Sequence, residues 1–172
     1  MSNYMKIKKY DIANGEGIRT SIFFSGCHFH CKGCFNKEAW DFEKGKFFSI
    51  DTYETEIKPS VSNHVSGISI LGGEPLHHKN ISSVVDLILF FKSDFPDKNI
   101  WLWTGYTWEE LMSIKEYLTS LEWILPNIDV IVDGQFIEEQ KDLNLKWRGS
   151  KNQRVIDVKK SLENKEVVLY KI

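Results

Sequence analysis

Short runs rich in apolar and β-branched residues recur along the chain, and each run stops at a loop that contains glycine. These runs cover residues 18–25, 67–71, 100–103 and 128–132. Runs of this length between glycine-containing loops are typical of buried strands. We therefore expect a strand at each of these four places, the first of them ending at Gly26.

Helical patterns follow several of these predicted strands. Residues 80–93 place apolar side chains three and four positions apart, and a Phe-Pro-Asp sequence follows them and ends the helix. A further helix is expected to begin at Thr107, because a glutamate three residues later completes a capping box. We expect less regular helices at about residues 51–60 and 136–140.

The repeated order of strand, loop and helix predicts a parallel sheet with right-handed crossovers. A complete eight-unit barrel needs at least about 200 residues, and this chain has 172. The expected fold is therefore α/β, a single domain over residues 1–172 whose mostly parallel sheet forms a partial (βα) barrel, open on one side. Residues 155–158 follow a basic stretch, and residues 166–170 are a candidate last strand.

Loops at the carboxyl ends of parallel strands meet at one edge of a sheet. We therefore expect four loops to lie together, at residues 27–34, 72–75, 104–106 and 133–134. Gly72 and Gly73 would let a ligand approach the backbone, and Glu74 would place a carboxylate beside them. On its own, such a sequence is most often only a turn.

The three cysteines of the chain, Cys27, Cys31 and Cys34, lie within eight residues at the spacing CxxxCxxC. Three thiolates can hold a cuboidal 4Fe-4S cluster and leave its fourth iron without a protein ligand, and an open position is what a reactive metal site needs. A disulfide framework is disfavoured because it would leave one cysteine unpaired. A structural zinc site is an alternative, with His28 or His30 as the fourth ligand.

Composition adds few constraints. The chain is 42% apolar with a formal net charge of −2, which fits a globular protein without a general attraction to nucleic acid or to an anionic membrane surface. The first ten residues lack the continuous apolar core of a signal peptide, and no later run approaches the length of a membrane span. We therefore expect a cytoplasmic protein, and thiols available for metal binding also fit a reducing compartment.

The CxxxCxxC sequence followed by Gly-Gly-Glu-Pro resembles the radical S-adenosylmethionine (SAM) superfamily. Within that superfamily, blocks along nearly the whole chain are similar to the family that activates the anaerobic ribonucleoside-triphosphate reductase. These blocks are residues 14–19, 33–37, 72–77, 101–106, 132–136 and 147–153. The resemblance implies that residues 1–172 form one radical SAM domain with a partial barrel of the radical SAM type.

The resemblance also implies roles for individual residues. The cluster ligands would be Cys27, Cys31 and Cys34. The residues that contact SAM would be Gly33, Cys34, Phe35, Gly72, Gly73, Glu74 and Thr104, with Trp103 and Tyr106 as weaker candidates. The cluster would reduce SAM, and the resulting radical would create a glycyl radical in the large subunit of the reductase. A protein such as flavodoxin would donate the electron.

The sequence leaves the roles of several residues undecided, and it allows more than one function. Arg148, Lys151 and Arg154 either contact the reductase or form a solvated basic edge. The histidines at positions 28, 30, 77 and 78 have no assigned role. Alternatives to the reductase activator are an activator of another glycyl radical enzyme of the pyruvate formate-lyase type, a small radical SAM enzyme acting on a metabolite, and a non-catalytic zinc-binding interaction module.

Overall fold

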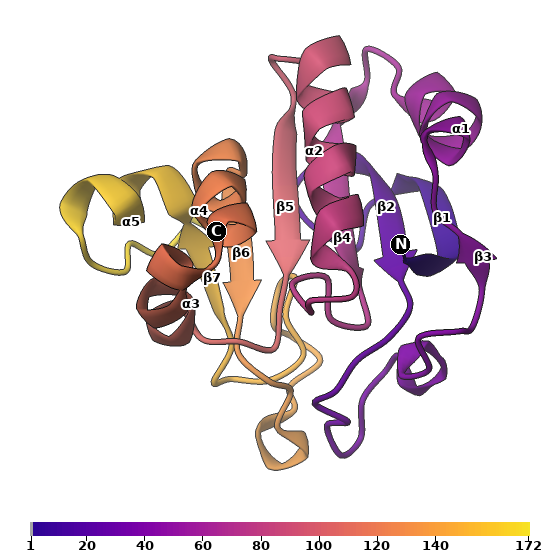
Figure 1. The fold of residues 1–172 in the computed structure, drawn as a ribbon. Coiled ribbons are helices and arrows are strands. Elements are labelled where there is room, and N and C mark those ends of the chain that lie inside the picture. The colour runs from indigo at the N-terminus through magenta and orange to yellow at the C-terminus, as the bar shows by residue number, and fades with distance from the viewer. Residues whose placement is uncertain (1) are drawn as a thin grey trace.

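The computed structural model describes residues 2–172. Its centre is a seven-stranded sheet in the order β3-β1-β2-β4-β5-β6-β7 (Figure 1). The strands are β1 (Asn3–Asp11), β2 (Ile18–Phe24), β3 (Lys46–Phe47), β4 (Val65–Gly72), β5 (Asn99–Trp103), β6 (Val130–Asp133) and β7 (Arg154–Asp157).

The four central strands, β2, β4, β5 and β6, are parallel, and the pairs at both edges of the sheet are antiparallel. One row of fully buried apolar residues crosses five strands in register: Ile22, Ile70, Leu102, Ile131 and Ile156. Because side chains alternate between the two faces of a sheet, this row fixes which residues of each strand face the helices.

Helices cover one face of the sheet, with α2 crossing in front of its middle in Figure 1. The α-helices are α1 (Ile50–Thr52), α2 (Ile81–Asp94), α3 (Trp108–Ile114), α4 (Thr119–Ile124) and α5 (Val158–Asn164). The 3-10 and π segments are η1 (Lys37–Ala39), η2 (Tyr53–Ile57), η3 (Lys58–Ser60), η4 (Lys115–Tyr117), η5 (Leu125–Asn127) and η6 (Glu138–Gln140). Thr107 caps α3, and its capping box with Glu110 is present as the sequence predicts.

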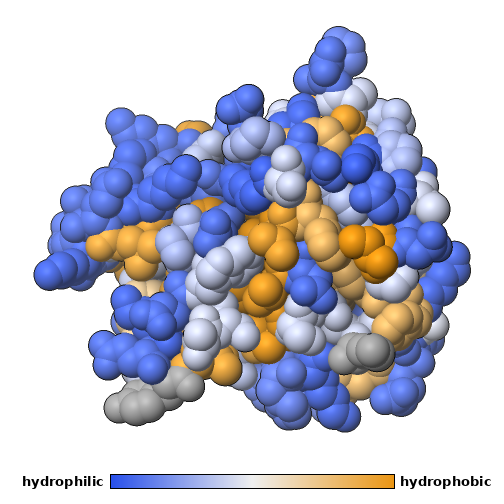
Figure 2. Space-filling model, turned by 45° about the horizontal axis from the view of Figure 1, so that its top comes forward, coloured by the Kyte–Doolittle hydropathy of each residue, from blue (hydrophilic) through white to orange (hydrophobic). Residues whose placement is uncertain are grey.

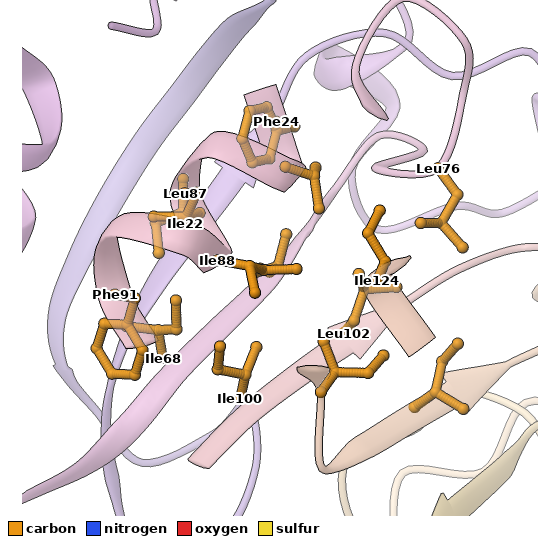
Figure 3. Close-up of a cluster of buried hydrophobic side chains, with 14 of the residues drawn as sticks. Ile22, Phe24, Ile68, Leu76, Leu87, Ile88, Phe91, Ile100, Leu102 and Ile124 are labelled. Carbon is orange, nitrogen blue, oxygen red and sulfur yellow. The ribbon is translucent and has the colours of Figure 1, made fainter. Parts of the chain in front are cut away.

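The main hydrophobic core lies between the sheet and these helices. Figure 3 shows Leu87, Ile88 and Phe91 of α2 packed close to strand residues such as Ile68 and Ile100. Each of these side chains is fully buried. Burial of a side chain of this size contributes about 1.5–3 kcal/mol, so this layer is the main source of stability for the central strands.

The opposite face of the sheet has a smaller aromatic core. Trp101 of β5 packs there with valines of β6 and β7, and Trp103, Trp147 and Tyr170 pack against them. Arg19 is fully buried in the same region and lies over the Trp101 ring. Both faces of the central strands are therefore covered, which explains why nearly every position of these strands is buried instead of every second one.

The face seen in Figure 2, which turns the top of Figure 1 forward, is mostly hydrophilic. Hydrophobic side chains appear in its middle and in smaller groups toward its edges. In the described part of the chain, no helix combines the length and the apolar character needed to cross a lipid bilayer.

The four predicted strands and the helices at residues 80–93 and 107 onward are confirmed. Two expectations are wrong: the helix expected at residues 136–140 is only the turn η6, and the stretch 166–170 makes one isolated bridge to β7 instead of a strand. The sheet is parallel in its centre, with antiparallel pairs at both edges. The segment 51–60 is helical but changes from α to π to 3-10 geometry. The partial barrel stays a prediction.

Asp11 provides a test of stability at the end of β1. It is fully buried and accepts hydrogen bonds from Ser21 Oγ at 2.6 Å and Asn14 Nδ2 at 2.6 Å, and it forms an ion pair with Lys8. Burial alone would raise the pKa of Asp11, but these bonds together lower it to about 2. The ionised form of Asp11 therefore stabilises the folded protein.

Replacing Asp11 with asparagine should lower the free energy of unfolding by about 1–3 kcal/mol at neutral pH, because buried donors lose a charged acceptor. Because the folded pKa lies below the unfolded value, the contribution of Asp11 is complete above about pH 4. It is lost as the pH falls toward 2. Urea unfolding of both proteins should show a difference that shrinks over this range. A constant difference would contradict the account.

Candidate functional site

The four loops expected to converge do lie together, at the carboxyl ends of the parallel strands and at the bottom of Figure 1. They surround an open pocket of about 520 Å³. Residues from each predicted loop line it, among them Cys27, Cys31, Cys34, Phe35, Gly72, Gly73, Glu74, Trp103, Thr104 and Gly134. Gly33 and Tyr106 are not lining residues; the α-carbon of Gly33 instead faces the side chain of Glu138.

Backbone hydrogen bonds join the cysteine loop to the glycine loop after β4. Gly73 N donates to Phe24 O at 2.8 Å, and Glu74 N donates to Gly26 O at 2.7 Å. The side chain of Asn80 adds bonds to Ser25 O and Glu74 O, both at 2.9 Å. The first cysteine therefore follows a backbone segment that is fixed from two sides.

The close approach of these loops requires glycine at position 73. A β-carbon there would overlap Gly26 O and lie 3.0 Å from Ala39 O, and both are backbone atoms that cannot move independently of the cysteine loop. Gly73→Ala should therefore push the two loops apart, lower the iron bound per chain, and cost about 1–3 kcal/mol of stability.

The matched control for that change is Gly149→Ala, whose β-carbon would have the side chains of Phe136 and Phe35 as its nearest neighbours instead of backbone atoms. Iron analysis after anaerobic reconstitution measures the effect. Equal iron content in both variants would show that the contact between the loops does not position the cysteines.

The three cysteines are half-buried free thiols on the wall of the pocket. Asn36 N points to Cys34 Sγ at 3.3 Å, an amide contact of the kind that stabilises negative charge on sulfur. Burial raises the pKa of the Cys27 thiol to about 11 and also raises that of Cys31. The thiolates therefore need a positive partner, which a metal centre supplies.

The donor set fits a 4Fe-4S cluster. All three cysteines line one pocket, and a cuboidal cluster requires each thiolate to bind a different iron. No group of three or more Cys, His, Asp or Glu side chains within residues 2–172 is arranged to hold a single metal ion. His28 and His30, the candidate fourth ligands of a zinc site, are absent from the described lining of the pocket.

Glu74 is buried at the back of the pocket, and its carboxylate binds its own chain. Oε1 accepts hydrogen bonds from Leu76 N at 2.9 Å and Thr104 Oγ1 at 2.8 Å, and Oε2 accepts one from Gly105 N at 2.7 Å. Burial raises the pKa of Glu74 to about 7 despite these three donors. The residue therefore ties the loop after β4 to the loop after β5, a role for Thr104 and Glu74 that the sequence did not reveal.

The segment 147–153 forms another wall of the pocket. Trp147 has a left-handed backbone with φ of 61°, and its carbonyl accepts a hydrogen bond from Trp103 Nε1 at 2.8 Å. Gln153 Oε1 accepts from Gly149 N at 2.8 Å, and Gln153 Nε2 donates to Gly134 O at 2.9 Å. The sequence did not point to Gln153, because an amide that organises a loop has no distinctive spacing.

The three basic candidates in this region have different surroundings. Arg148 lines the pocket, while Lys151 is exposed near Asp142 at 3.8 Å. Arg154 is bound to two carboxylates, Asp133 and Glu109. These two ion pairs keep the Arg154 guanidinium occupied within the chain.

The histidines with no assigned role lie beside the cysteine loop. His30 stacks on Trp40 at 4.5 Å between ring centroids, and His28 lies 5.1 Å from His77. His77 and His78 are neighbours at 4.1 Å. Burial is the main cause that lowers the pKa of His77 to about 4, so this ring is neutral at physiological pH.

Comparison with known proteins identifies the family. Residues 13–156 match the family model described as a 4Fe-4S single cluster domain. A protein of Vibrio cholerae is 42% identical over 88% of this chain and 95% of its own length. Relatives of Escherichia coli K12 and of Enterobacteria phage T4 are 38% and 35% identical, each over 89% of this chain and 97% and 92% of their own lengths.

Each of these three relatives is named anaerobic ribonucleoside-triphosphate reductase-activating protein. The match covers the four loops that surround the pocket and the segment 147–153 that forms a further wall of it. On this evidence the chain belongs to the family of anaerobic ribonucleoside-triphosphate reductase-activating proteins, with a 4Fe-4S single cluster domain.

Proposed function

We propose that this protein activates an anaerobic ribonucleoside-triphosphate reductase by generating a glycyl radical on its large subunit. The observation that carries the proposal is that all three cysteines and the Gly-Gly-Glu loop line one open pocket in a member of this family. The reaction is an oxidoreductase reaction of the radical SAM type, with SAM as the second cofactor. An external one-electron donor such as flavodoxin is part of the same proposal.

Cys27, Cys31 and Cys34 would hold the cluster. When bound there, the cluster would supply the electron that splits SAM into methionine and a 5′-deoxyadenosyl radical, and this radical would remove a hydrogen atom from a glycine Cα of the reductase. The chain must then bind SAM against the cluster in one orientation, since a misplaced reacting atom lowers the rate strongly. It must also limit the access of water to the reacting atoms.

The structure offers groups for each of these tasks. Gly72 and Gly73 expose backbone at the pocket wall, where a β-carbon on Gly73 would overlap neighbouring backbone. Glu74 fixes Thr104 and Gly105, so the loop after β5 presents a constant surface. Phe35 and Trp103 supply apolar and aromatic surface to the same pocket, which suits an adenosyl group.

A protein substrate requires an open site. The side chains of Phe35 and Leu143 line the pocket and are 62% and 82% exposed. Large exposed apolar residues at the rim of a pocket are common at protein contacts. We therefore propose that the glycine-bearing segment of the reductase enters here, and that the sheet is a partial barrel of the radical SAM type, open on this side.

Activation of purified partners tests the proposed function. The anaerobically reconstituted protein, SAM, a reductant and the reductase should give a glycyl radical signal by electron paramagnetic resonance (EPR). A glycyl radical enzyme of the pyruvate formate-lyase type is the comparison partner and should give none. A signal only on the second partner would assign the other activator class, and zinc without sulfide in the isolated protein would support the zinc-binding module.

A further inference from the structure

The three arginines of the chain differ in how far the protein itself uses their hydrogen-bond donors. Arg19 makes five hydrogen bonds to its own chain. Arg154 is bound by the carboxylates of Asp133 and Glu109. Arg148 makes a single bond, from Nη1 to Gln153 O at 3.0 Å. Of the three, Arg148 therefore has the most unused binding capacity.

One of the unused donors of Arg148 is buried. Its Nε–H is shielded from water and has no acceptor among the described residues. Buried polar groups are normally paired, so an unpaired one calls for a specific explanation. A group that binds to the guanidinium and completes its hydrogen bonds would provide that explanation.

The position of Arg148 points to the class of that group. Among the described residues that line the pocket, Arg148 is the one cation, and the acidic residues are Glu74 and Asp142. Glu74 is already bound by three donors of its own chain. A pocket with one available cation is suited to a ligand that carries one anionic group.

The backbone on both sides of Arg148 is fixed by neighbouring groups. The carbonyl of Trp147 is held by the indole of Trp103, and the amides of Gly149 and Ser150 are held by the side chain of Gln153. Trp147 keeps a left-handed conformation that costs energy for a residue with a side chain. Strain of this kind is concentrated at ligand-binding sites.

We propose that Arg148 binds the carboxylate of the pocket's ligand, which under the function proposed above is the α-carboxylate of SAM. A guanidinium binds a carboxylate with two parallel hydrogen bonds, which also fixes the orientation of the bound group. Arg148 then sets the orientation of the methionyl part of SAM in the pocket. This inference rests on the proposed function but makes a separate claim about one residue.

Equilibrium dialysis against two ligands tests whether Arg148 binds the carboxylate of SAM. The ligands are SAM and its decarboxylated analogue, S-adenosyl-(5′)-3-methylthiopropylamine, and the protein is the anaerobically reconstituted holoprotein. The variants are Arg148→Gln and Arg148→Lys, with Lys151→Gln as the control, because Lys151 is an exposed cation three residues away that does not line the pocket.

Arg148→Gln should weaken SAM binding at least about tenfold and change binding of the analogue less than about twofold, because only SAM carries the carboxylate. Arg148→Lys should lie between the wild type and Arg148→Gln, since a lysine keeps the charge without the paired geometry. Lys151→Gln should leave both affinities unchanged.

The outcomes separate the two proposals. The assignment of Arg148 is wrong if both variants lose the same affinity for SAM as for its analogue, or if neither variant loses affinity for either ligand. SAM binding by the wild type would then still stand. If the wild-type holoprotein binds no SAM, the proposed function fails and this inference fails with it. The iron and sulfide content of each variant shows whether it carries the cluster. If Arg148→Gln does not carry the cluster, the affinities of Arg148→Lys for the two ligands are compared with those of the wild type.

Discussion

Replacing Cys31 with alanine should remove the cluster and all glycyl radical formation. The chain has no fourth cysteine, and no group of three or more metal-binding side chains elsewhere in the described residues is placed to act instead. Two thiolates are too few to hold a 4Fe-4S cube with only one open iron. Cys27→Ala and Cys34→Ala should behave in the same way.

Iron and acid-labile sulfide analysis after anaerobic reconstitution measures this effect. The wild type should hold about four irons and four sulfides per chain if one cluster is bound, and each cysteine variant should hold close to none. The matched control is Lys32→Gln, an exposed change between two of the cysteines that removes only ion pairs to Glu138 and Glu139. Full cluster content in Cys31→Ala would contradict the proposed ligands.

Glu74→Ala should have the second largest effect, this time on stability as well as on the site. Removing the carboxylate leaves three donors without their acceptor, those of Leu76, Thr104 and Gly105. A buried donor left unpaired costs about 1–3 kcal/mol. We therefore expect a loss of about 3 kcal/mol or more, a large share of the 5–15 kcal/mol that stabilises a typical domain.

Thr104→Val is the matched control for Glu74→Ala, because it has nearly the same shape and removes one of the three donors. It should cost about 1 kcal/mol. Denaturant unfolding of the apoproteins gives both values without contributions from a cluster. A loss of less than 1 kcal/mol in Glu74→Ala would mean that the carboxylate does not hold the two loops together.

Local sequence patterns predicted the central strands and the convergence of their loops, because both depend on short apolar runs and on the glycines that follow them. Strand β1, which pairs on its outer side only with the two-residue strand β3, was missed for a physical reason. Its outward positions carry lysines such as Lys6 and Lys8, and few of its residues are buried. Charged edge strands protect a sheet from further pairing, and they lack the apolar run that marks a central strand.

The antiparallel direction of β7 was also not predicted. A parallel partner for β6 would need a crossover with a helix, and the segment after β6 forms only η6 and a loop. Polar side chains bind the backbone of that loop, as when Asn152 Nδ2 donates to Gln135 O at 2.8 Å. This competition between side chain and backbone prevents a regular helix.

Within the site, the sequence predicted which loops meet but not how they bind each other. Glu74 was expected to face a ligand, and the structure shows its carboxylate bonded to the loop after β5. That contact joins residues about 30 positions apart, and its geometry depends on the register between β4 and β5. The roles of Gln153 and Arg148 depend in the same way on a long connection that local patterns do not specify.

EPR spectroscopy of the reduced holoprotein, recorded with and without SAM, tests most directly whether the three cysteines hold a cluster whose remaining iron is open to SAM. The account predicts the signal of a reduced 4Fe-4S cluster that changes shape and position when SAM is added, because SAM becomes a ligand of the open iron. An intact cluster whose spectrum is unchanged at saturating SAM would contradict it.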